Sequence, residues 1–171
     1  MNDQDYFALF GLPHCFGLDD AVLEAAWKRV AMAVHPDRFA TGSAAEKRVA
    51  MQWSARANEA YRVLKNPLLR ARYLCEFAGV DLQTETNTSM SADFLMQQMQ
   101  WHERLDELND HPNASDVAGF KQELAVALTE TIAHVQSLLD EKRFAQAAER
   151  VREWMFLDKL IKITDGLTTD I

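Results

Sequence analysis

Two predicted helices are separated by the stretch Val34-His35-Pro36-Asp37-Arg38-Phe39. A proline drives the residue before it out of the helical region, so Pro36 ends the first of these helices. An aspartate such as Asp37 then favours a turn. Taken by itself, the stretch is interpreted as a helix stop followed by a turn, and any further meaning depends on the segments around it.

The helices on either side of this stretch are predicted from their caps and their apolar faces. Asp19 or Asp20 can cap the first helix, and Ser43-Ala-Ala-Glu46 fits a capping box at the start of the second. Apolar residues then recur at helical spacing in both helices. They are Leu23, Trp27, Val30 and Val34 in the first helix, and Val49, Trp53, Ala57, Ala60 and Leu64 in the second.

Two further helices are predicted in the first half of the chain. A short one covers about residues 6–10 and is stopped by Gly11 and Pro13. Another covers about residues 67–77, where a proline is tolerated in the first turn. The segment that follows, residues 81–90, is polar and aperiodic, which predicts a linker.

Three longer helices are predicted after the linker, over about residues 91–109, 115–140 and 144–164. Short connections between long helices favour an antiparallel bundle. The chain is therefore expected to be all-α, with one domain over residues 1–80 and a three-helix bundle over residues 91–171.

Charge is spread unevenly over the 171 residues, whose net charge is −8. Residues 1–80 hold ten basic and nine acidic side chains, whereas residues 81–171 hold eight and seventeen. An acidic second half argues against nucleic acid or an anionic membrane as a partner. No apolar run approaches the roughly 20 residues that span a bilayer, and the N-terminus is polar and acidic, so a cytoplasmic protein is expected.

The residues that usually carry catalysis or bind metals show no recognisable spacing. The histidines do not form an HExxH motif, and the chain has neither GxSxG nor a phosphate-binding loop. Cys15 and Cys75 are sixty residues apart, which favours two reduced thiols over a disulfide or a zinc site. We therefore expect no enzymatic activity, no metal and no cofactor.

Several segments accompany the His-Pro-Asp tripeptide in the order and at the separations of a J domain. They are Asp5-Tyr-Phe7, Leu9-Phe-Gly-Leu12, Asn58-Glu-Ala-Tyr-Arg-Val-Leu64, Asn66-Pro67 and Arg70-Ala-Arg-Tyr73. From residue 4 to about residue 75 the chain therefore resembles the J-domain family. This resemblance implies a helical hairpin with the tripeptide at its tip, where it would dock on a DnaK-like chaperone and trigger ATP hydrolysis there.

The same resemblance implies which residues contact the chaperone. His35, Pro36 and Asp37 would make the central contact, with Pro36 holding its neighbours out of the helix so that they project. Asp37 can accept charge-assisted hydrogen bonds. Lys28, Arg29 and Arg38 would dock against an acidic surface, where basic residues mainly speed and orient encounter. For Lys28 and Arg29 an ordinary solvated helix face is the alternative.

The first predicted bundle helix has more apolar surface than one core stripe requires. Phe94, Trp101, Leu105 and Leu108 share one side of it, whereas Leu95, Met96 and Met99 lie largely away from that side. Taken alone, the second group is expected to pack against other helices. The alternative is a partner surface, because methionine suits adaptable apolar sites and an acid-rimmed exposed patch marks one.

The bundle also resembles a known family. The segments Phe94-Leu-Met-Gln-Gln-Met99, Glu103-Arg-Leu-Asp-Glu107, Ala147-Ala-Glu-Arg-Val-Arg152 and Phe156-Leu-Asp-Lys-Leu160 are similar to the C-terminal bundle of the HscB family of J-domain co-chaperones. The resemblance implies a patch that binds an IscU-like iron–sulfur scaffold. Its residues here are Leu95, Met96, Met99, Gln100, Glu103, Glu107 and Phe156. Gln100 stands where an acid is expected, so its role is the least defined.

The two resemblances together imply a co-chaperone of iron–sulfur cluster biogenesis. It would deliver the scaffold to an HscA/DnaK-like ATPase chaperone and stimulate that chaperone through the His-Pro-Asp loop. A J-domain co-chaperone with a different client is the alternative. The chain begins at the J domain, without the cysteine-rich zinc segment of some eukaryotic relatives, which favours a bacterial form. A monomer is expected, with no nucleic acid or membrane partner.

Overall fold

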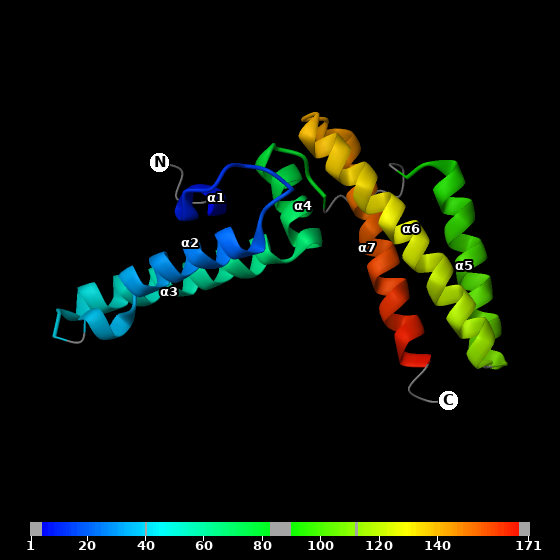
Figure 1. Cartoon of the computed structure of the whole chain (residues 1–171), viewed down its shortest axis with the longest axis horizontal. Helices are drawn as coiled ribbons and strands as arrows, with labels where there is room; N and C mark the ends of the chain where they lie inside the picture. Colours follow the sequence, from blue (N-terminus) through cyan, green and yellow to red (C-terminus); the bar gives the residue numbers. More distant parts are fainter. Residues whose placement is uncertain (1–4, 40, 83–89, 112, 168–171) are drawn as a thin grey trace. The chain divides into compact units, whose positions relative to one another are not determined.

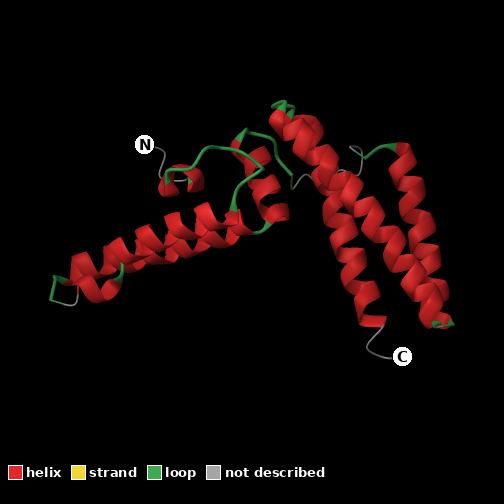
Figure 2. Ribbon diagram, in the orientation of Figure 1, coloured by secondary structure: helices red, strands yellow, loops and turns green. Residues whose placement is uncertain are grey.

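The computed structural model describes residues 5–39, 41–82, 90–111 and 113–167. These residues form helices joined by loops, and the predicted all-α class is confirmed (Figure 2). In chain order the helices are α1 (Tyr6–Phe10), α2 (Asp20–Ala33), the 3₁₀ turn η1 (Pro36–Phe39), α3 (Ala44–Lys65), α4 (Pro67–Phe77), α5 (Ala92–Asp110), α6 (Ala114–Asp140) and α7 (Phe144–Leu167). The chain divides into two compact units, residues 1–74 and 75–171.

The first unit is built on the hairpin of α2 and α3, which lie side by side with η1 at their far end (Figure 1). Asp19 caps α2, and Ser43 and Glu46 form the predicted capping box at the start of α3. The buried face of α3 consists largely of alanines, and the ring of Trp27 on α2 stacks on Tyr61 of α3 with centroids 4.7 Å apart. The buried residues of these helices are Leu23, Ala26, Ala50, Ala57, Ala60 and Leu64.

The predicted apolar face of α3 is wrong in its first half. Val49 and Trp53 were expected in the core, but they are 51% and 37% exposed, and Ala50 is buried instead. The small Ala50 side chain therefore belongs to the buried face of α3, and the larger Val49 and Trp53 side chains lie outside it. The second half of the face, including Ala57 and Leu64, is buried as predicted.

The second unit contains α5, α6 and α7, with α6 and α7 packed along one another (Figure 1). The core joins all three helices, as the predicted bundle requires. It consists of Trp101, Leu105, Leu108, Val117, Phe120, Leu124, Leu157 and Leu160. Trp101 Nε1 and Arg104 Nη1 both donate to the carboxylate of Glu123, at 2.8 and 2.6 Å, which ties α5 to α6.

Helix α5 lies one residue further along the chain than predicted, and the boundaries of α6 and α7 also differ from the prediction. Helix α6 begins at Ala114 because the side chain of Asn113 accepts the Ser115 N–H at 2.9 Å, one residue before the expected start. Helix α7 continues to Leu167 rather than ending at Thr164. Residues 83–89 of the predicted linker lie outside the described residues. Within the described ranges, no helix has the length and apolarity needed to cross a bilayer.

Candidate functional site

The first candidate site is the turn that joins α2 to α3. Helix α2 ends at Ala33, and the Val34 N–H still donates to Val30 O. The chain then turns once in η1, where the Arg38 N–H donates to His35 O at 3.0 Å. Sequence reasoning placed the residues beside Pro36 outside any helix, but Asp37 lies inside this 3₁₀ turn, because the proline's fixed φ suits a first helical turn.

His35 and Asp37 face each other across this turn. The Asp37 N–H donates to His35 Nδ1 at 3.3 Å, and that nitrogen lies 3.6 Å from Asp37 Oδ2. The side chains are 57% and 91% exposed, respectively. The carboxylate is therefore presented to a partner with most of its hydrogen-bonding capacity available. The side chain of Pro36 lies outside the described part of the chain.

The three predicted docking cations have different environments. Lys28 pairs with Glu24 at 2.6 Å, and this hydrogen bond and charge raise the pKa of Lys28. Arg29 donates to Phe10 O at 3.1 Å and so ties α2 to the end of α1. Arg38 donates to Met32 O at 3.3 Å, near the end of α2. Because exposed ion pairs contribute little, Lys28 can exchange Glu24 for an acidic residue of a partner.

A groove brings part of this predicted set together. Lys28, His35 and Arg38 line it, together with Trp27, Ala31 and Met32, and its volume is about 570 Å³. Arg29 is not among the lining residues. Sequence reasoning missed the apolar residues that line this groove. Met32 was the available signal, because it lies off the predicted core stripe, and in the structure it is 71% exposed.

The second candidate site is on α5 and α7. Met96 and Met99 are 63% and 64% exposed, and Leu95 is half-buried, so the first two do not pack in the core. Packing was the simpler expectation from the residues alone, and for Met96 and Met99 it is wrong. Gln100, Glu103 and Glu107 are exposed.

Phe156 lies on α7 and packs against α5. Its ring centroid lies 5.9 Å from Phe94, 6.2 Å from Trp101 and 5.5 Å from His102. The ring is half-buried, so Phe156 belongs partly to the bundle core. The exposed ring of His102 lies edge-on against Phe156.

The charge on α5 is predominantly negative. Its acidic residues are Asp93, Glu103, Asp106, Glu107 and Asp110. Its one arginine, Arg104, is already bound to Glu123 of α6. An exposed apolar pair on an acidic helix suits a partner that offers apolar side chains among basic ones.

The described residues include few groups that could bind a metal ion or act as a nucleophile. In the described part of the chain, no cluster of three or more His, Cys, Asp or Glu residues lies close enough to hold a metal ion. Burial, reinforced by the charge of Glu76, raises the pKa of the Cys75 thiol to about 11. A buried thiol of that pKa is unreactive at neutral pH.

Comparison with known proteins supplies a second line of evidence. Residues 90–163 match the family model described as the HSCB C-terminal oligomerisation domain. The chain is 59% identical to the co-chaperone protein HscB homolog of Bordetella petrii over 161 residues, 94% of each chain. It superimposes on chaperone HscB from Vibrio cholerae with a TM-score of 0.83 and 30% identity, covering 98% of this chain and 99% of that one. Human co-chaperone protein HscB shares its fold, with a TM-score of 0.89 and 24% identity over 100% of this chain and 85% of that one.

Proposed function

Because this chain belongs to the HscB family of J-domain co-chaperones, we propose that it recruits an iron–sulfur scaffold to an ATPase chaperone. It binds an IscU-like scaffold through α5 and α7, and it stimulates an HscA/DnaK-like chaperone through the His-Pro-Asp loop. As a co-chaperone it is not itself an enzyme. In this proposal residues 1–80 act as the J domain, residues 81–90 as the linker and residues 91–171 as the scaffold-binding domain, in the cytoplasm.

The exposure of Asp37 is the observation that carries the chaperone half of this proposal. Its side chain is 91% exposed, on a turn held by the hydrogen bond from Arg38 N–H to His35 O. A carboxylate held in this way can accept charge-assisted hydrogen bonds from an arginine of the chaperone. Lys28 and Arg38, in the adjoining groove, would orient the encounter with acidic chaperone residues.

The scaffold half rests on the exposed methionines. Met96 and Met99 offer unbranched, polarisable side chains that adapt to a partner's surface. Glu103 and Glu107 lie four residues apart on the same helix and can pair with basic scaffold residues around the apolar contact. Leu95, Gln100 and Phe156 complete the proposed surface, with Phe156 anchored by its packing on α5.

Joining the two sites in one chain would make the recruitment effective. While the bundle holds the scaffold, the tip engages the chaperone, so the scaffold reaches a high local concentration near the chaperone's peptide-binding groove. ATP hydrolysis then traps the scaffold there. The co-chaperone binds both partners and determines when hydrolysis occurs, and the chaperone hydrolyses the ATP.

Single-turnover ATP hydrolysis by an HscA-like chaperone with its scaffold tests this function. Wild-type protein should stimulate hydrolysis strongly, and Asp37→Asn should reduce the stimulation by roughly tenfold or more, because a charged acceptor is lost. Asp140→Asn, an exposed carboxylate on α6 outside the proposed contacts, is the matched control and should behave as wild type. Equal stimulation by wild type and Asp37→Asn would refute the role of the loop. If the wild-type protein stimulates hydrolysis but does not bind the scaffold, its client is a different protein.

A further inference from the structure

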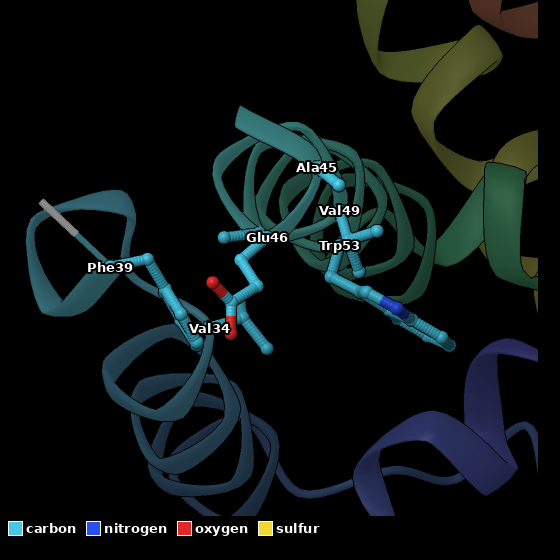
Figure 3. A pocket seen from close by; sticks show the side chains of 7 residues that line it. Val34, Phe39, Ala45, Glu46, Val49 and Trp53 are labelled. Carbon is cyan, nitrogen blue, oxygen red and sulfur yellow. The ribbon is translucent and has the colours of Figure 1, made fainter. Parts of the chain in front are cut away.

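A second hollow lies beside the His-Pro-Asp turn, between the end of α2 and the first half of α3. We call it the tip notch, and its lining residues are Val34, Phe39, Ala45, Glu46, Val49, Ala50 and Trp53. In Figure 3 Val34 and Phe39 form one wall, Val49 and Trp53 extend from α3 as the other, and Glu46 lies between them. None of these residues belongs to the chaperone-binding set inferred from the sequence.

The tip notch is apolar and open to a partner. Val49 and Trp53 are 51% and 37% exposed, and Phe39 is half-buried. The volume of the notch is about 280 Å³. That is slightly below the range of roughly 300–1,000 Å³ typical of small-molecule pockets, so it suits a side chain better than a cofactor.

The walls of the notch are fixed by local hydrogen bonds. The Ser43 N–H and hydroxyl both donate to the Glu46 carboxylate, at 2.7 and 2.8 Å, which holds the first turn of α3. The Gly42 N–H donates to Phe39 O at 2.9 Å and so connects η1 to that turn. A preformed site of this kind loses little conformational entropy when it is filled.

The position of the tip notch and the charge around it both favour the chaperone that engages Asp37 as the partner that fills it. Phe39 follows Asp37 by two residues, so their Cα atoms are separated by at most about 7.6 Å. The notch therefore lies close to any partner that engages Asp37. Residues 34–56 hold four basic side chains and two acidic ones, and one of the acids, Glu46, is occupied by Ser43. The guanidinium of Arg56 also lies 5.9 Å from the centre of the Trp53 ring.

We propose that the tip notch receives a large apolar side chain from an acidic segment of the same ATPase chaperone that engages Asp37. This inference rests on the proposed function. It assigns Val49 and Trp53 as affinity-determining residues, whereas Asp37 triggers hydrolysis. The basic surroundings favour an acidic partner and disfavour the same surface of a second copy, which has the same sign of charge.

The experiment measures chaperone ATPase activity against co-chaperone concentration for wild type, Asp37→Asn and the double variant Val49→Gln/Trp53→Gln. Met51→Gln is the matched control, because Met51 lies on α3, is 62% exposed and does not line the notch. The double variant should raise the half-maximal concentration roughly tenfold while the plateau stays near that of wild type, because a buried aromatic contact is lost. Met51→Gln should match wild type. Thermal unfolding of each variant verifies that the fold is kept.

The outcomes separate this inference from the proposed function. If Asp37→Asn loses stimulation but the double variant matches Met51→Gln, the notch plays no part in chaperone binding and only this inference falls. If Asp37→Asn stimulates normally, the proposed function falls and the inference falls with it. A changed sedimentation coefficient of the double variant would assign the notch to a second copy. A changed affinity for the scaffold would assign it to the client, and either result overturns the proposal.

Discussion

Met96 and Met99 are the residues at which the proposed binding role separates most clearly from folding. Both side chains are more than 60% exposed, so replacing them removes no core packing. We predict that Met96→Gln/Met99→Gln weakens scaffold binding by more than tenfold, since apolar contacts at the centre of an interface carry most of its affinity. Isothermal titration of the scaffold measures the effect, and the urea midpoint should not change.

Two comparison variants make that prediction specific. Val126→Gln replaces a 48% exposed apolar residue on α6, outside the proposed patch, and should leave scaffold affinity unchanged. Phe156→Ala should lower both affinity and stability, because its ring packs against Phe94 and Trp101. If Val126→Gln weakens binding as much as the methionine variant does, the scaffold does not bind at this patch.

Cys75 makes the free energy of unfolding depend on pH, and the burial of its thiol sets the direction of that dependence. Its thiol has a pKa of about 11 in the fold, against an ordinary value of 9.0. Below pH 9 the thiol is protonated in both the folded and the unfolded state and has no effect. Between pH 9 and 10 the unfolded thiol ionises while the folded one does not, so the free energy of unfolding falls by up to about 1.4 kcal/mol per pH unit.

Urea unfolding at pH 8, 9 and 10 measures this loss of stability. Cys75→Ala should remove most of the decrease between pH 9 and 10, although it also costs some packing at every pH. Tyr73, whose pKa burial raises, contributes above pH 10, so the narrower window isolates the thiol. The same slope in wild type and Cys75→Ala would show that another group titrates.

Residue-level reasoning from sequence succeeded where a side chain acts locally. Ser43 and Glu46 were recognised as a capping box from their spacing alone, and Asp19 or Asp20 was recognised as the α2 cap. The role of Asp37 comes from its motif and stays a prediction. The use of Arg29 to bind Phe10 O was not predictable, because nineteen residues separate the partners and only the packing of α1 on α2 brings them together.

Element-level reasoning failed where two faces of one helix are both apolar. Periodicity placed Val49 and Trp53 on the core stripe of α3, but the hairpin packs through Ala50 and leaves the larger residues on the flank. On α5 periodicity left the same ambiguity, and the structure buries Trp101 and exposes Met96. A sequence pattern shows that a face is apolar, but not whether another helix of the same chain covers it.

The turn between α6 and α7 gives a prediction at the scale of an element. Lys142 has a φ of 59°, and its N–H and that of Arg143 donate to Leu139 O and Leu138 O, a Schellman arrangement that usually holds glycine. Lys142→Gly should raise the free energy of unfolding by about 0.5–1 kcal/mol, because the left-handed conformation is strained for a residue with a Cβ. Chemical denaturation measures the gain.

A matched control for this prediction is Arg143→Gly, the next residue along. Arg143 does not have a positive φ, so glycine there should destabilise the chain by increasing the entropy of the unfolded state and by removing the pairing of Arg143 with Glu141. A loss of stability in Lys142→Gly as well would mean that contacts of the lysine side chain outweigh the backbone strain.

For the whole molecule, the two candidate sites differ in charge and in the kind of surface that they present. The first 80 residues are nearly neutral and present a carboxylate beside basic side chains, whereas the remaining residues are strongly acidic and present methionines. The sequence alone revealed this separation, because charge and composition do not depend on packing. The contacts that complete each site, such as His102 against Phe156, required the three-dimensional structure.

This division predicts that both sites must be in the same chain. Asp37→Asn should still bind the scaffold, and Met96→Gln/Met99→Gln should still engage the chaperone. A mixture of these two variants therefore has both activities, but on different molecules. Because linkage raises effective affinity by about 10²–10⁴-fold, the mixture should give less than about a tenth of the scaffold-enhanced ATPase rate of wild type at equal concentration. Steady-state ATPase assays with chaperone and scaffold measure the rate. A mixture as active as wild type would show that the sites act independently, and recruitment by tethering would then not be the mechanism.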